Sequence, residues 1–104
     1  MILRTWHGRT KRADADDYER FLIDRAAPDY GAVPGLDSVT FTRRDEGDVS
    51  HFLLVTLWRD MDAVRDFAGD DPAAAKYYPE DERYLLEKEP QSLNHEVFHT
   101  ARQD

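Results

Sequence analysis

Cysteine is absent from this chain of 104 residues, which excludes disulfides, thiolate metal sites and a cysteine nucleophile. No apolar run approaches the roughly 20 residues that a membrane-spanning helix needs. Positive charge is scarce, because 14 Lys and Arg stand against 22 Asp and Glu, and the formal net charge is −8. Binding to nucleic acid or to an anionic membrane requires a basic surface, so the composition argues against both classes of partner.

The length and composition of the chain are typical of one small domain spanning residues 1–104. Twelve aromatic residues, two of them Trp, argue against disorder despite the high charge. The first seven residues have neither a basic region nor an apolar core of the kind that a signal peptide carries. We therefore expect no signal peptide and a cytoplasmic location.

Strands and helices follow from residue periodicity. Four segments have strand character, the third being the most apolar, and Gly47 predicts a hairpin loop between the second and the third. A first helix is expected to end at or near Pro28, and a second to begin after Asp60 and end before Gly69. Asp71 and Pro72 predict a further helical turn. The expected strands are 2–10, 36–44, 49–58 and 91–99, the first helix runs from about 14–17 to about 27, and a last helical stretch covers about 80–87.

The order β-α-β-β-α-β predicts a ferredoxin-like α+β sandwich, with one antiparallel sheet and both helices on one face. Residues 49–58 are mainly apolar on both faces, although helices cover only one. We therefore expect a second copy of the chain to cover the other face, giving a homodimer with two-fold symmetry. The alternative is that loops or the C-terminal tail cover it.

Five segments of the chain form a distinctive set. They are Trp6-His7, Pro34-Gly35, residues 57–69 (LWRDMDAVRDFAG), residues 74–81 (AAKYYPED) and residues 94–97 (NHEV). These segments resemble the antibiotic biosynthesis monooxygenase family, whose fold is the dimeric α/β barrel. The resemblance covers nearly the whole chain, is most specific from Trp58 to Asp81, and implies the same fold as the periodicity does. The functions of such proteins range from cofactor-independent quinol-type monooxygenases to haem-degrading oxygenases.

By this resemblance a ligand lies between the sheet and the helices, and six residues are nominated for the site. His7 or His95 would be the base, and Tyr77 or Tyr78 a hydroxyl donor, with one of the two expected to face the pocket if they lie on a helix. Each also has a plain structural interpretation, as a hydrogen-bonded sheet histidine or as core packing. The catalytic candidates are His7, His95 and Tyr77, and the substrate-pocket candidates are Trp58, Phe67 and Tyr78.

The leading hypothesis is a monooxygenase that oxidises an aromatic, quinol-type small molecule with O₂, without metal, flavin or nicotinamide. No histidine or carboxylate group has metal-ligand spacing, and His51 and His99 are expected in solvent. The haem-degrading branch has Asn, Trp and His where this chain has His7, Phe67 and Tyr77, which disfavours haem degradation and leaves haem binding through Tyr77 as a third hypothesis. The main alternative is a non-catalytic, stress-associated dimer that binds an apolar small molecule.

Basic residues form a further cluster. The first two strands run parallel in the expected fold, so their carboxyl ends meet at one end of the sheet. One interpretation is that the basic side chains at this end of the sheet attract an anionic substrate. The alternative is that they are solvated surface charges. Arg4 is expected to point into the dimer barrel with Glu96 as its partner. The cluster consists of Arg9, Lys11, Arg12, Arg43 and Arg44.

Overall fold

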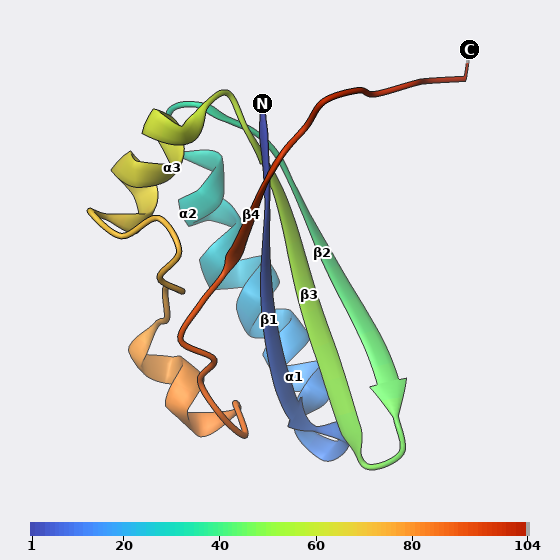
Figure 1. The fold of residues 1–104 in the computed structure, drawn as a ribbon. Coiled ribbons are helices and arrows are strands. Elements are labelled where there is room, and N and C mark those ends of the chain that lie inside the picture. The colour runs from blue at the N-terminus through green and yellow to red at the C-terminus, as the bar shows by residue number, and fades with distance from the viewer. Residues whose placement is uncertain (104) are drawn as a thin grey trace.

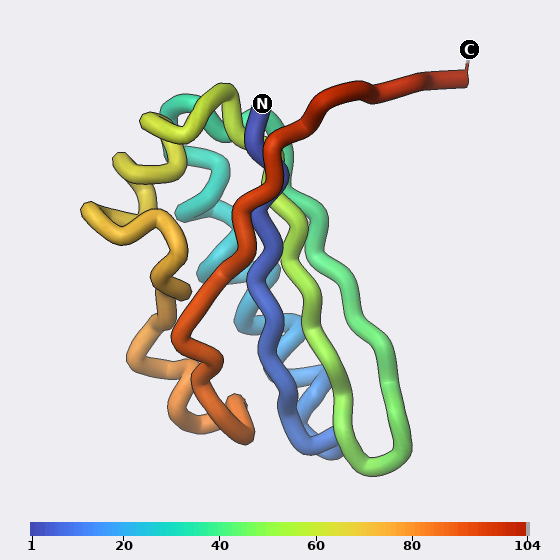
Figure 2. Tube along the Cα trace, in the orientation of Figure 1, coloured from blue at the N-terminus to red at the C-terminus, as the bar shows by residue number. Residues whose placement is uncertain are grey.

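The computed structural model describes residues 1–103. Its centre is one antiparallel sheet with the strand order β2-β3-β1-β4, and the helices gather on one side of it (Figure 1). This is the predicted ferredoxin-like α+β fold, and Figure 2 follows its single chain path. The strands are β1 (Ile2–Lys11), β2 (Leu36–Glu46), β3 (Val49–Trp58) and β4 (Leu93–Glu96).

The three long strands confirm the predictions from alternation. The bounds of β3 agree with the predicted ones, and β1 and β2 each run one or two residues further than predicted. Gly47 takes a φ of 59° in the two-residue turn between β2 and β3, a conformation that glycine adopts without strain.

The helical segment before β2 is longer than predicted. Pro28 does not end it, because a π turn precedes this proline, in which the Ala27 N–H donates to the Leu22 carbonyl. Pro28 then stands in the first turn of the next helix, where a missing N–H leaves no intrahelical bond unmade. The segment comprises η1 (Arg12–Asp14), α1 (Ala15–Phe21), η2 (Leu22–Ala26) and α2 (Ala27–Gly31).

Helix α3 (Met61–Ala68) begins and ends as predicted. The Asp60 side chain accepts a hydrogen bond from the Ala63 N–H at 2.9 Å, which caps the first turn. Gly69 follows the last turn with a φ of 92°. Among residues 1–103, no helix is both long enough and apolar enough to cross a lipid bilayer.

The chain after α3 departs most from prediction. Residues 71–74 form a single turn, residues 75–78 lie outside helix and strand, and the last helical stretch is the short η3 (Pro79–Arg83) rather than 80–87. Strand β4 covers four residues rather than 91–99. It pairs with the first residues of β1, Glu96 opposite Ile2, so the chain beyond Val97 has no strand left to pair with and runs away from the body (Figure 1).

Side chains alternate between a helix-covered face and an open face. The core packs on the covered face, around Trp6, Tyr18, Phe52, Leu54 and Trp58. The open face, which no helix of residues 1–103 covers (Figure 1), carries Leu3, Thr5, His7 and Arg9 from β1 and His51, Leu53, Val55 and Leu57 from β3.

Arg4 corrects one prediction. It shares the face of Trp6 as expected, but this is the helix-covered face, so its buried side chain points away from any barrel between two sheets. Its guanidinium donates to the carbonyls of Pro72 at 2.6 Å and Ala74 at 2.8 Å. Backbone oxygens therefore take the place of the carboxylate that Glu96 was expected to supply.

Candidate functional site

A cavity of about 230 Å³ opens between α2, α3 and residues 76–78. Its walls are rich in phenols and also carry one ammonium and one carboxylate. We call it the phenol pocket. It is lined by Asp29, Tyr30, Val33, Phe67, Lys76, Tyr77 and Tyr78.

Local structure explains how Tyr77 and Tyr78 both reach this cavity. A helix was considered for them, but residues 75–78 lie outside helix and strand and the backbone of Tyr78 is extended, so the two neighbouring side chains diverge. Tyr77 packs edge-on against Trp6 at 5.8 Å between ring centroids, and Tyr78 packs edge-on against Phe21 at 5.7 Å. Both rings line the pocket, rather than one of the two as predicted.

Aromatic rings form the apolar wall of the pocket. The Tyr30 ring stacks on Phe67 at 5.3 Å between centroids, and Phe67 in turn lies 5.1 Å from Trp58. Trp58 is fully buried, and its indole N–H donates to the Thr56 hydroxyl at 2.7 Å. Phe67 therefore forms part of the wall, whereas Trp58 supports that wall from behind.

The polar groups of the pocket are mainly hydrogen-bond donors. The Tyr78 hydroxyl donates to Asp29 at 2.7 Å, and the Tyr77 hydroxyl donates to the Glu89 carbonyl. Lys76 Nζ donates to the Phe67 carbonyl at 2.9 Å and lies 4.6 Å from the centre of that ring. Burial raises the pKa of Tyr30 to about 12 and raises the pKa of Tyr77 and Tyr78 as well. At neutral pH these phenols therefore keep their protons.

A smaller hollow of about 20 Å³ adjoins the phenol pocket, with Tyr30, Lys76 and Tyr78 lining both. This volume is enough for about one water molecule. Trp6 also lines it, and the Trp6 indole N–H is buried without a hydrogen-bond partner. The two cavities thus share part of their lining, and the smaller one is also lined by the core residue Trp6.

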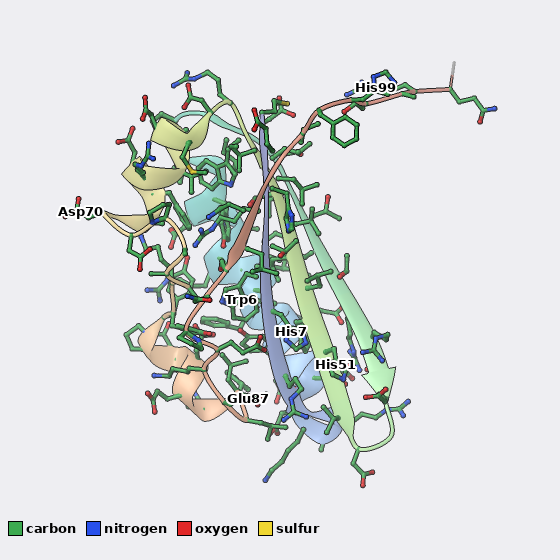
Figure 3. The ribbon with its side chains drawn as sticks, in the orientation of Figure 1. Trp6, His7, His51, Asp70, Glu87 and His99 are labelled. Atoms are coloured by element: carbon green, nitrogen blue, oxygen red, sulfur yellow. The ribbon has the colours of Figure 1, made fainter. Side chains whose placement is uncertain are left out.

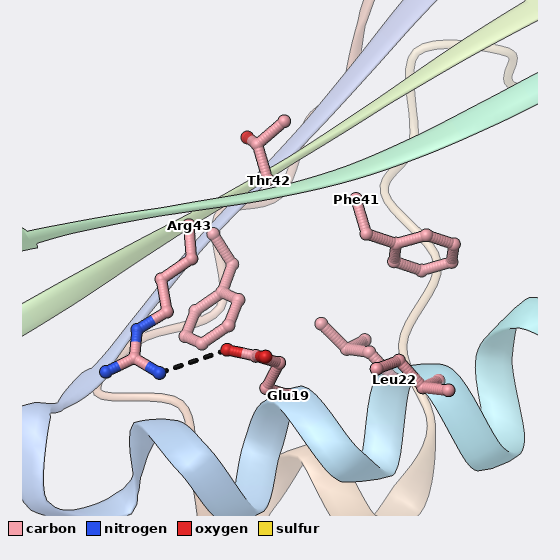
Figure 4. Close-up of a pocket in the computed structure, with 7 residues that line it drawn as sticks. Glu19, Leu22, Phe41, Thr42 and Arg43 are labelled. Carbon is pink, nitrogen blue, oxygen red and sulfur yellow. Dashed lines mark hydrogen bonds and ion pairs between the residues drawn. The ribbon is translucent and has the colours of Figure 1, made fainter.

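A second cavity, of about 270 Å³, lies between α1 and the edge strand β2 (Figure 4). Its polar group is Arg43, which already contacts Asp16 at 2.7 Å, Glu19 at 3.0 Å and Asp45 at 2.9 Å. These ion pairs leave little charge to recognise a ligand, and none of the six nominated residues lines this cavity. It is lined by Glu19, Leu22, Ile23, Phe41, Thr42, Arg43 and Phe52.

The two nominated histidines lie away from the phenol pocket. His7 and His95 are on the open face, on the other side of the sheet, and His95 is exposed beside Leu3. His7 contacts Glu89 through Nδ1 and His51 through Nε2, the latter at 3.0 Å. Figure 3 shows His7 and His51 side by side on β1 and β3. His51, predicted in solvent, has a side chain only 16% exposed.

Four lining residues were missed by sequence reasoning, namely Asp29, Tyr30, Val33 and Lys76. The first helix was expected to end near residue 27, whereas the helical segment continues through the π turn to Gly31 and so carries Asp29 and Tyr30 to the pocket. Lys76 lay within the segment of resemblance but was not singled out. No local pattern marks these positions, because tertiary packing brings them together.

The basic cluster is largely neutralised. Arg9 pairs with Glu87 at 2.6 Å, Arg12 with Asp45 at 3.7 Å and Arg44 with Glu46 at 3.3 Å. Together with the ion pairs of Arg43, these contacts favour the interpretation as paired surface charges over a site for anions.

Comparisons with known proteins show the fold. No family model and no curated protein matches the sequence. Among solved structures, a Bacillus cereus protein provisionally described as an antibiotic biosynthesis monooxygenase is similar with a TM-score of 0.61 and 10% identity, over 98% of this chain and 97% of that one. A mutant of MhuD, with two manganese protoporphyrin IX molecules bound per active site, has a TM-score of 0.64 and 18% identity, over 99% and 100%.

A third structure, PA3566 from Pseudomonas aeruginosa, has a TM-score of 0.58 and 17% identity, over 96% of this chain and 93% of that one. The resemblance to the antibiotic biosynthesis monooxygenase family is thereby confirmed at the level of the fold. At these identities the likeness does not carry an activity.

The MhuD structure raises the question of whether haem fits here. The phenol pocket is too small for a porphyrin, and the Tyr77 hydroxyl that would bind iron already donates to the Glu89 carbonyl. The residues present therefore do not fit a haem site of that kind.

Proposed function

We propose that this protein is a cofactor-independent monooxygenase that oxidises a small quinol-type phenol with O₂ in the phenol pocket. The observation that carries the proposal is the composition of that pocket, in which stacked aromatic walls surround protonated phenols and an ammonium. The Bacillus cereus neighbour of this fold, provisionally described as an antibiotic biosynthesis monooxygenase, supports it.

The reaction needs no redox group from the protein. An ionised hydroquinone gives electrons to O₂, one oxygen atom enters the ring, and the other leaves as water. Hydroquinone and O₂ thus yield a hydroxyquinone and H₂O, with all four electrons supplied by the substrate. The protein has to bind the substrate as its anion, exclude bulk water and stabilise the negative charge that forms on oxygen.

The residues of the pocket suit these tasks. Lys76 has N–H groups beyond the one bound to the Phe67 carbonyl, and Tyr30 is a hydroxyl donor, so both can stabilise a phenolate. Phe67 would stack on the substrate ring. Since His7 and His95 lie across the sheet, we assign proton acceptance to water at the pocket mouth rather than to a histidine. Tyr77 stays a proposed site residue, but its one hydroxyl proton is already donated to the Glu89 carbonyl, so its oxygen would accept a hydrogen bond from a substrate hydroxyl.

The size of the pocket narrows the substrate class. A cavity of about 150 Å³ is known to hold benzene, so about 230 Å³ fits a substrate of one or two rings. We therefore expect hydroquinones and naphthohydroquinones to be better substrates than three-ring anthrones.

The test is oxygen uptake by the purified protein, with chelator present and without added flavin or nicotinamide. Uptake above autoxidation is expected with small hydroquinones. Tyr30→Phe and Lys76→Met should each lower kcat/KM by about 10²-fold, the usual effect of removing one donor to a developing anion. Ile23→Val, which changes the cavity beside β2, is the matched control and should leave the rate unchanged.

Two outcomes would contradict this assignment. If both pocket variants retain full activity, the reaction takes place elsewhere. If no hydroquinone is consumed while one still quenches Trp fluorescence in a saturable manner, the non-catalytic binding protein becomes the better description.

A homodimer is part of the proposal. Leu3, Val55, Leu57 and Leu93 gather on the open face, and Leu93 is 58% exposed. Phe98 on the departing tail is 97% exposed. A second copy facing the first would bury these side chains. The cytoplasmic location stays a prediction from the sequence.

A further inference from the structure

Four side chains form a continuous chain of contacts across the open face. Glu89 contacts His7 Nδ1, His7 Nε2 faces His51 Nδ1 at 3.0 Å, and His51 Nε2 faces Glu46 at 3.1 Å. The members come from β1, β2, β3 and the segment before β4, so only the folded chain assembles them. We call this set the histidine chain.

The protons of the histidine chain can be counted. Each of its three contacts requires one proton between the two heavy atoms. An ionised carboxylate brings none, and a neutral imidazole carries one N–H. Two neutral rings therefore supply protons for two of the three contacts. The remaining contact has no proton, and there a nitrogen lone pair faces a carboxylate oxygen or the lone pair of the other ring. All three contacts are favourable only when the set holds a third proton.

A metal ion cannot take the place of that proton. The two ring centroids lie 5.3 Å apart with planes 25° apart, and the facing nitrogens are 3.0 Å apart. Among residues 1–103, no three His, Asp or Glu side chains are arranged to hold a metal ion, and these four side chains contact one another in series rather than around one point. The separation of the facing nitrogens is that of an N–H···N hydrogen bond.

The charged groups around the histidine chain are of both signs. Arg44, opposite His51 in the register, pairs with Glu46, whereas Arg9 pairs with Glu87. Contacts with His51 first, and then with Arg44, hold the pKa of Glu46 below its usual value. Glu46 is therefore an ionised acceptor at the end of the chain. On the neighbouring segment, Lys88 pairs with Glu82.

Glu89 connects the histidine chain to the phenol pocket. Its side chain contacts His7 on the open face, and its carbonyl accepts the Tyr77 hydroxyl bond on the pocket side. The segment around it contacts β1 through the Leu86 N–H, which donates to the Arg9 carbonyl at 2.9 Å. The His7–Glu89 contact thus helps to hold both this segment and Tyr77 in place.

We propose that Glu89, His7, His51 and Glu46 form a proton-binding site, and that the proton it holds latches residues 85–91 onto β1 and fixes the Tyr77 hydroxyl. His7 is then a positioning residue for Tyr77 rather than a base that touches substrate. Loss of the proton makes one contact repulsive and loosens the segment. The effect on Tyr77 matters for catalysis only if the proposed function holds, but the latch itself does not depend on it.

The test is nitrogen NMR of the histidine rings combined with amide hydrogen exchange, between about pH 5 and pH 9. The His7 and His51 nitrogens should titrate as a coupled pair with one shared proton. After correction for intrinsic exchange, the Leu86 amide should exchange about tenfold faster above the transition than below it, as expected for the loss of one hydrogen bond of this kind.

Glu46→Gln is the decisive variant. The side-chain amide that it introduces can donate to His51 Nε2, so two neutral rings then complete all three contacts and no third proton is needed. Leu86 should remain slow to exchange across the whole pH range. Glu89→Gln should also keep the Leu86 amide slow to exchange. Its amide can donate to His7 Nδ1, and the N–H groups of the two rings then point toward His51 and Glu46. Glu87→Gln removes a neighbouring ion pair of the same segment and should keep the pH dependence of the wild type.

The proposal is overturned if His7 and His51 titrate independently, or if Leu86 exchange in Glu46→Gln follows the wild-type pH dependence. Neither readout requires turnover. Absence of oxygen uptake would therefore count against the proposed function alone, while a flat exchange profile in the wild type would count against the latch alone.

Discussion

At the residue scale, Asp81 is an unusual feature because it is a carboxylate only 2% exposed. It accepts hydrogen bonds from the Tyr18 hydroxyl at 2.8 Å and from the Tyr78 N–H at 2.6 Å, and so joins η3 to α1 behind the phenol pocket. Burial raises its pKa above the usual 3.8, an effect larger than the opposing hydrogen bonds. The folded state therefore favours the protonated carboxyl.

This shift gives a pH-dependent stability. A carboxyl whose pKa is higher when folded stabilises the protein below pH 3.8, and this contribution is lost as the pH rises through the raised pKa. Asp81→Asn removes the titration. The free energy of unfolding of the variant minus that of wild type should therefore increase from acid to neutral pH, as measured by urea unfolding at several pH values.

Asp24→Asn is the control for the same chemical change at an exposed position of the helical layer. A constant difference for Asp81→Asn would show that the buried carboxyl does not titrate in this range. Asp81→Ala should cost about 2–3 kcal/mol at neutral pH, because the Tyr18 hydroxyl and the Tyr78 N–H lose their acceptor.

At the scale of elements, the approach of α3 to the start of β2 depends on Gly35. Its φ is 84°, and an added Cβ would lie 2.6 Å from the Cβ of Ala63. Gly35→Ala should therefore destabilise the protein by about 1–3 kcal/mol in chemical denaturation, from backbone strain and from the contact with α3.

Gly31→Ala is the matched control. Gly31 ends α2 and has no neighbouring heavy atom within 4 Å of an added Cβ. This substitution should be neutral or stabilising by less than about 1 kcal/mol. Equal effects of the two substitutions would show that close packing at Gly35 is not what requires glycine.

The elements also show how far the sequence predicts this molecule. β1, β2, β3 and α3 have strong periodicity and clear caps, and they were predicted almost to the residue. The segment 70–92 lacks both periodicity and caps, and it contains three prolines. It forms turns and irregular chain, whose path depends on contacts with β1. The bond between His7 and Glu89 joins residues 82 positions apart, and no local sequence pattern can predict such a contact.

The same limit applies to the candidate site. Phe67, Tyr77 and Tyr78 were placed at a pocket by resemblance, and they line one. His7 and His95 were nominated for the same pocket, but strand alternation puts them on the open face. Alternation predicted that His7 is opposite to Trp6, yet it does not tell which face the helices cover.

At the scale of the whole molecule, the open face predicts self-association. Light scattering at micromolar concentration should give about twice the mass of one chain, 12.1 kDa. Val55→Asp places an unpaired charge at the centre of this face and should give a folded monomer. Ile23→Lys, on the exposed side of the helical layer, should remain dimeric. A wild-type monomer would mean that the tail or another molecule covers the face.

Only the first half of β1 is paired with β4, from Ile2 to Thr5, whereas the segment of residues 85–91 is joined to the rest of that edge by the bridge between Thr10 and Leu85 and by the bond from the Leu86 N–H to the Arg9 carbonyl. An uncovered strand edge is a template for strands of other chains. Release of this segment would expose such an edge, so the histidine chain that retains it also protects the protein against aggregation.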